Sequence, residues 1–98
     1  MNREQYLLVC LAEECAEVAQ RVSKALRFGL DEIQPGQKLT NSQRITQELN
    51  DLAAVAEMLI ADKSIDGLQR GAVDAKKAKV KAFMAYSVQC GTLTPESK

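Results

Sequence analysis

The sequence has no histidine and no tryptophan, few aromatic residues, and no excess of either charge over its 98 positions. Without histidine, His-ligated zinc sites and the Ser-His-Asp and Cys-His types of catalysis are excluded. Lys plus Arg and Asp plus Glu are 13 each, so the chain lacks the basic excess that non-specific nucleic-acid binding needs. No run of about 18 apolar residues is present, so we expect no membrane span.

Cysteine is also scarce, and its pattern gives no disulfide framework. The odd count of three, the absence of a CxxC pair and the absence of a leader-like start favour a reducing, cytoplasmic setting. Cys10 and Cys15 are five residues apart on one expected helix, so their side chains point about 140° apart and cannot easily pair. We interpret the thiols, with Cys90, as buried small apolar groups rather than reactive ones.

Apolar residues recur at helical spacing in three segments, which predicts an all-α fold. We expect helices over residues 3–27, 42–62 and 72–89. Gly29 and Gly91 suit the ends of the first and third helices, and Thr40, Asn41 and Ser42 are N-cap candidates for the second. The segments 29–40 and 62–71 are expected loops, with short turns as options at 30–33 and 64–69, and 92–98 is an expected frayed tail.

The length of the chain predicts a single domain over residues 1–98. Its 29 large apolar residues are spread over three helical stripes, beside 13 alanines. This is too little for a closed bundle in one chain, because small domains bury a modest share of their surface. We therefore predict a helical bundle of three main helices per chain, whose core is completed by homo-oligomerisation as a dimer or tetramer.

Acidic residues recur one helical turn apart in both of the first two helices. The first helix carries Glu13, Glu14 and Glu17, and the second carries Glu48 and Asp51. Residues at i and i+3 share a face, so two antiparallel helices would gather four carboxylates from these pairs in one pocket. On a helical wheel, Glu48 falls inside the apolar arc of its helix, where an unpaired charge is unfavourable.

Converging carboxylates repel one another and raise one another's pKa, and a divalent cation relieves this repulsion. Because carboxylate oxygens are hard ligands, the pattern favours Mg²⁺, with Mn²⁺ as a possible substitute. The predicted metal ligands are Glu14, Glu17, Glu48 and Asp51. The alternative is that Glu14 and Glu17 are solvated, or pair with Arg21 and Lys24 at helical spacing.

The EExxE motif on one helix and ExxD on the next resemble the signature of the all-α nucleoside triphosphate pyrophosphohydrolase superfamily. This superfamily includes MazG-like proteins, dimeric dUTPases and dCTP pyrophosphatases. The similarity is carried by LAEECAEVAQ at 11–20 and QELNDL at 47–52, and SKALRFG at 23–29 looks like the small MazG-like proteins. It extends over residues 4–93.

The resemblance implies an enzyme of nucleotide-pool housecleaning that hydrolyses (deoxy)nucleoside triphosphates to the monophosphate and pyrophosphate. By motif position, the four predicted ligands match the family's metal ligands, and Glu13 matches the first acid of the motif. Carboxylates are the available bases, so we expect Glu13 or Glu17 to assist an attacking water. Glu14 is the third predicted catalytic residue. Candidate contacts to the triphosphate are Lys24, Arg27, Lys76 and Lys79.

Other interpretations stay open at the level of the sequence. Phe28 and Tyr86 are candidates for stacking on a base, although core packing is the more ordinary role of an aromatic residue. The chain is alternatively a non-catalytic helical interaction or regulatory module with an acidic docking face, or a pyrophosphohydrolase of another nucleotide-like substrate. The sequence does not indicate a base or sugar preference.

Overall fold

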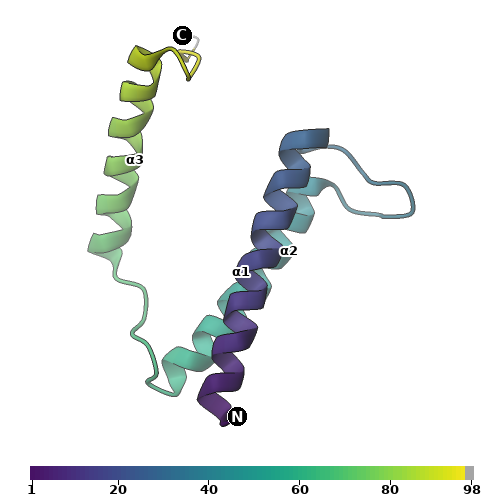
Figure 1. The fold of residues 1–98 in the computed structure, drawn as a ribbon, viewed down its shortest axis with the longest axis vertical. Coiled ribbons are helices and arrows are strands. Elements are labelled where there is room, and N and C mark those ends of the chain that lie inside the picture. The colour runs from purple at the N-terminus through teal and green to yellow at the C-terminus, as the bar shows by residue number, and fades with distance from the viewer. Residues whose placement is uncertain (97–98) are drawn as a thin grey trace. The chain divides into compact units, whose positions relative to one another are not determined.

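The chain is all-α, as the periodicity predicts (Figure 1). The computed structural model describes residues 1–96, which form α1 (Arg3–Phe28), α2 (Asn41–Ala61) and α3 (Arg70–Cys90) without any strand. Each helix begins and ends within two residues of its predicted bounds. The helical turn offered at 64–69 is wrong, because this segment, which contains Gly67, is irregular. No helix in the described part of the chain is long and apolar enough to cross a membrane.

Helices α1 and α2 pack side by side in opposite directions as a hairpin (Figure 1). Both begin with a capping box, in which two otherwise unpaired backbone N–H groups find partners. Asn2 accepts from the Gln5 backbone at 2.8 Å, and Thr40 accepts from the Gln43 backbone at 3.1 Å. The glutamine side chains accept in return from the cap residues' own N–H groups.

At the end of the hairpin opposite the loop, an ion pair joins the two helices. Arg3 Nε in the first turn of α1 lies 2.7 Å from Asp62 Oδ2, which follows the last turn of α2. The capping boxes fix where the helices begin, and this pair links the start of one helix to the end of the other.

The hairpin buries few large side chains. Leu7, Ala25 and Leu59 form the buried apolar core, and Leu59 alone has no exposed surface. Helical spacing places Cys15 and Leu26 on the apolar face of α1, and this face is only partly covered, since Cys15 is exposed and Leu26 is 84% exposed. The prediction of buried thiols is therefore wrong for Cys15 and Cys90, which are exposed, while Cys10 is half-buried.

The loop between α1 and α2 is fixed by backbone and side-chain hydrogen bonds. α1 ends at Gly29, whose φ of 97° is a conformation that glycine adopts readily. A turn at Leu30 and Asp31 confirms the option of a short turn in this segment. The Asn41 backbone N–H donates to Glu32 O at 3.0 Å, and the Ser42 N–H donates to Leu30 O at 2.9 Å. The loop is thereby held against the start of α2.

Residues 1–66 and 67–98 form two compact units, and each is described by itself. In the second unit, α3 ends at Gly91 in the left-handed conformation, and Thr92 and Leu93 donate to Ser87 O. No residue of α3 is buried, and Val80, Phe83 and Met84 form an exposed apolar stripe. Residues 97–98 of the expected tail lie outside the described residues. That the chain forms a single domain stays a prediction.

Candidate metal centre

Three of the predicted ligands converge where α1 packs against α2. One carboxylate oxygen each from Glu14, Glu17 and Glu48 lies within 4.8 Å of the others. Glu14 and Glu17 are one turn apart on α1, and Glu48 comes from the neighbouring face of α2. The hairpin therefore brings together the acidic motifs, as expected from antiparallel helices.

The convergence places polar atoms in a partly apolar environment. Glu14 and Glu48 are half-buried, while Glu17 is exposed. Within residues 1–96, the Oε2 atoms of Glu14 and Glu48 are buried and have no hydrogen-bond partner. A buried acceptor without a partner is unfavourable, so a hydrogen-bond donor or a cation at either oxygen would stabilise the folded state.

The pKa values of two cluster residues reflect this environment. Burial, followed by the negative charges of Glu17, Asp51 and Glu13, raises the pKa of Glu14 above its ordinary value. The pKa of Glu48 is raised first by a hydrogen bond that its protonated carboxyl can make with the Glu17 side chain, and then by burial and the nearby carboxylates. Both shifts favour the protonated form, as expected where like charges converge without a cation.

The remaining acids of the two motifs lie around this centre. Asp51 is exposed and close enough for its charge to act on both Glu14 and Glu48, but it is outside the group of three converging oxygens. Glu13 is exposed beside Glu14. The structure therefore brings Glu14, Glu17 and Glu48 together, with Asp51 and Glu13 at the rim.

The alternative of ion pairing along α1 finds no support in the geometry. In the described chain the ion pairs are Arg3–Asp62 and Arg70–Asp74, and neither includes an acid of the cluster. Arg21, one turn beyond Glu17, has a buried Nη1 atom without a hydrogen-bond partner in the same range. The acids are therefore not neutralised by the basic residues that follow them on the helix.

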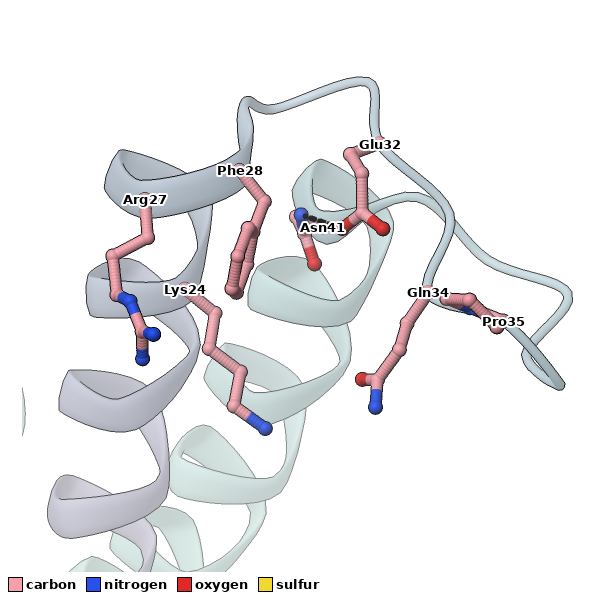
Figure 2. A pocket seen from close by; sticks show the side chains of 7 residues that line it. All are labelled: Lys24, Arg27, Phe28, Glu32, Gln34, Pro35 and Asn41. Carbon is pink, nitrogen blue, oxygen red and sulfur yellow. Dashed lines mark hydrogen bonds between the residues drawn. The ribbon is translucent and has the colours of Figure 1, made fainter.

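Lys24 and Arg27 line a pocket of about 340 Å³ at the loop end of the hairpin (Figure 2). Its other lining residues are Phe28, Glu32, Gln34, Pro35 and Asn41. The Arg27 guanidinium lies 4.8 Å from the centre of the Phe28 ring, a cation–π distance. Two of the predicted phosphate contacts and one predicted stacking residue thus share a pocket.

The other two basic candidates belong to the second unit. Lys76 lines a pocket of about 510 Å³ with Leu68, Val73 and neighbouring residues, and Lys79 Nζ lies 6.0 Å from the centre of the Phe83 ring. Tyr86 is exposed on the same helix. Their roles toward a ligand stay predictions.

Sequence reasoning missed four residues of the pocket, namely Glu32, Gln34, Pro35 and Asn41. Asn41 was considered only as an N-cap, but Thr40 takes that role and leaves the Asn41 side chain free to turn back toward the loop. No local pattern marks Glu32 or Gln34, because they reach the pocket through the path of the loop. An asparagine directly after a good N-cap residue was the one available signal.

Comparisons with protein-family models, curated proteins and solved structures find no match to this chain.

The raised pKa values predict that the metal-free protein becomes less stable as pH rises. In the interval between the ordinary glutamate value of 4.5 and the raised values, the folded state binds more protons than the unfolded state. The contribution of these groups to the free energy of unfolding therefore falls as pH rises through that interval. Urea unfolding in EDTA, from about pH 5 to about pH 7.5, measures this slope.

Substitutions distinguish the contribution of the carboxylate cluster to this pH dependence from that of the other titrating groups. Glu48→Gln removes one of the repelling charges, so its unfolding midpoint should decline less with pH than that of the wild type. Glu57→Gln, an exposed α2 site half a helical rotation away, should keep the wild-type slope. Parallel slopes for all three proteins would contradict the account of repulsion at the centre.

Proposed function

We propose that this chain is a Mg²⁺-dependent nucleoside triphosphate pyrophosphohydrolase, which cleaves between the α- and β-phosphates to give a monophosphate and pyrophosphate. The observation that carries the proposal is the convergence of Glu14, Glu17 and Glu48 from two helices. The match of these positions to the EExxE and ExxD motifs supports it further. A housecleaning role in the nucleotide pool, in the cytoplasm, is part of the same proposal.

The donor set suits a hard divalent cation. The buried oxygens of Glu14 and Glu48 have no protein donor in the described chain, and all the converging atoms are carboxylate oxygens. Such ligands favour Mg²⁺, with Mn²⁺ as a substitute. We propose Glu14, Glu17 and Glu48 as protein ligands, with Asp51 completing the set. The cation would neutralise charge on the phosphate oxygens during hydrolysis.

The chain's own side chains would do the remaining work. Exposed Glu13 and Glu17 are the proposed bases, because a carboxylate beside the site can accept a proton from the attacking water. The water's oxygen would bond to the α-phosphorus, and the bond from that phosphorus to the oxygen that bridges the α- and β-phosphates would break, so that pyrophosphate leaves. Lys24 and Arg27 on α1 are the proposed cationic contacts to the substrate, and for Lys76 and Lys79 on α3 a contact to phosphate stays a prediction from the sequence.

We also propose that the active form is a homo-oligomer, a dimer or tetramer. Of the 29 large apolar residues, 17 are exposed in the single chain, including the α3 stripe. Contiguous exposed apolar surface favours association, since burial contributes about 25 cal/mol per Å². A second copy of the chain carries the same exposed α3 stripe, so the stripes of two copies could pack against each other.

Glu48→Gln should reduce hydrolysis by about 100-fold or more, since even outer-shell partners of a metal commonly contribute 10- to 100-fold. The amide keeps the shape of the side chain but is a weaker ligand for Mg²⁺. The assay incubates each protein with a panel of nucleoside triphosphates and Mg²⁺, and compares released pyrophosphate with released phosphate.

Glu57→Gln is the matched control for this assay and should hydrolyse at the wild-type rate. Wild-type activity in Glu48→Gln, or an equal loss in Glu57→Gln, would remove Glu48 from the proposed site. If the wild type hydrolyses nothing in the panel, the non-catalytic interaction module becomes the better interpretation.

Mg²⁺ should stabilise the folded protein. A cation that binds the native state adds RT ln(1 + [L]/Kd) to the free energy of unfolding, roughly 1 to 3 kcal/mol at about 10 to 100 times Kd. The effect should be larger near neutral pH than near pH 4, where the carboxylates are protonated. Thermal melting in Mg²⁺ and in EDTA measures it, and identical midpoints at neutral pH would rule out the centre.

Self-association should be measurable by sedimentation equilibrium at micromolar concentration, where we expect the mass of a dimer or tetramer. Phe83→Glu would place a charge in the exposed α3 stripe and should shift the distribution toward the monomer. A stable monomer of the wild type would contradict the proposed assembly.

A further inference from the structure

The pocket at the loop end of the hairpin contains an amide whose orientation is fixed (Figure 2). Asn41 Nδ2 donates to Gly29 O and to Glu32 Oε1, each at 2.9 Å. An asparagine amide has two N–H donors, so both are used, and a flip would place its oxygen against two acceptors. Asn41 is only 3% exposed, so this arrangement is held by its surroundings. What Asn41 can offer a ligand is its acceptor oxygen.

Glu32 and Gln34 add an acceptor and a donor to the same pocket. One oxygen of Glu32 is occupied by Asn41, which leaves the other as an acceptor. Gln34 Oε1 accepts from Arg44 Nη1 at 3.1 Å, which turns the amide so that its nitrogen is the group left for a ligand. Two acceptors and one amide donor therefore line the loop side of the pocket.

The α1 side of the pocket provides an aromatic face and positive charge. Phe28 is 53% exposed, so its ring is accessible to a planar ligand. Arg27 and Lys24 lie on the preceding turn, and Figure 2 shows both side chains on the α1 side of the pocket with Phe28. An apolar face, hydrogen-bonding groups and nearby cations are together the features that recognise a base attached to phosphate.

The register of both helices aligns this pocket with the carboxylate centre. Lys24 is seven residues beyond Glu17 on α1, and Asn41 is seven residues before Glu48 on α2. Seven residues are nearly two full turns, so each pair shares a helix face and is separated by about 10 Å along the axis. Because the helices run in opposite directions, both displacements lead to the loop end. One extended ligand can thus contact both places.

We propose that this pocket is the base subsite, and that it selects nucleotides whose base carries an exocyclic amino group. This inference rests on the proposed function and adds its substrate class. The Asn41 oxygen and the second Glu32 oxygen accept the amino hydrogens of cytosine, adenine or guanine, as a carboxylate does from the cytosine amino group. Phe28 stacks on the base, and Gln34 donates to a ring nitrogen or carbonyl.

Thymine and uracil are disfavoured at this edge by repulsion. Each has a single donor on this edge, the ring N3–H, flanked by carbonyl oxygens, so it can satisfy one of the Glu32 and Asn41 oxygens while a carbonyl oxygen faces the other. A buried acceptor left against another acceptor loses its hydrogen bond, and sites built on such groups discriminate strongly. We expect wild-type kcat/KM to be at least about tenfold higher for dCTP than for dTTP.

The test compares kcat/KM for dCTP, dGTP, dATP and dTTP in the wild type, Glu32→Gln and Asp31→Asn. Glu32→Gln can keep its oxygen on Asn41 and present an amide donor to the base, so the ratio of dCTP to dTTP should fall by about tenfold or more. Asp31→Asn makes the same chemical change one residue away, outside the pocket, and should keep the wild-type ratio. An unchanged ratio in Glu32→Gln overturns the proposal.

Phe28→Ala provides a second variant if Glu32→Gln does not fold. Removing an exposed ring should leave the fold intact, and loss of stacking should raise KM for all four nucleotides by about fivefold or more. Wild-type KM values in this variant would overturn the base subsite.

A binding measurement separates this inference from the proposed function. Without metal, dCMP, dGMP and dAMP should shift the amide NMR signals of Phe28, Glu32 and Asn41, and dTMP should shift them much less. If the wild type hydrolyses no triphosphate but these shifts occur, the hydrolase proposal fails and the base subsite stands. If dTMP shifts the same signals equally, or none of the four does, the base subsite fails whatever the enzyme assay gives.

Discussion

Repulsion among carboxylates at the junction of α1 and α2 is the constraint on which the rest of this structure depends. The packing of the two helices holds Glu14, Glu17 and Glu48 within reach of one another, and two of their oxygens are buried without partners in the described chain. Burial and like charge at this distance are both unfavourable for ionised carboxylates. Burial is the first cause of the raised pKa of Glu14 and a hydrogen bond with Glu17 is the first cause of the raised pKa of Glu48, and the neighbouring charges add to both. Protonation or a bound cation would relieve it, and only the second leaves the site charged and ready for phosphate chemistry at neutral pH.

The same helix packing places a second polar pocket in line with the first. Each helix advances seven residues, nearly two turns, from the carboxylates to the loop end, where Lys24 and Asn41 lie. The hairpin is therefore organised along its axis, with converging carboxylate oxygens in the middle and a cationic, partly aromatic pocket at one end. The side-chain bonds that fix the Asn41 amide act beside the backbone bonds from Asn41 and Ser42 that hold the loop on α2, so the same few residues set the loop's structure and the pocket's polarity.

The hairpin has a sparse apolar core. Leu7, Ala25 and Leu59 are the buried apolar residues, whereas Leu26 and the α3 stripe face outward. A polar centre at the helix junction displaces apolar contacts that would otherwise stabilise the pair. In the proposed oligomer, a second chain would provide the apolar burial that this hairpin lacks.

Helical periodicity and end signals were sufficient to predict the elements of this fold. Gly29 and Gly91 end their helices as predicted, and Thr40 is the N-cap of α2. The convergence of Glu14, Glu17 and Glu48 followed from i, i+3 spacing on antiparallel helices. Exposure was not predictable in the same way, because a helical stripe shows which face is apolar but not whether another element covers it; Cys15 and Leu26 are the examples. The pocket residues Glu32 and Gln34 were missed because a loop's path has no periodicity.

Direct observation of a paramagnetic cation tests the central claim. Micromolar Mn²⁺ added to the isotope-labelled protein should broaden the amide NMR signals around Glu14, Glu17 and Glu48 first, and excess Mg²⁺ should restore them. Glu48→Gln should need considerably more Mn²⁺ for the same broadening. Equal, weak broadening at the centre and at exposed acids such as Glu57, unaffected by the substitution, would contradict a metal site between α1 and α2.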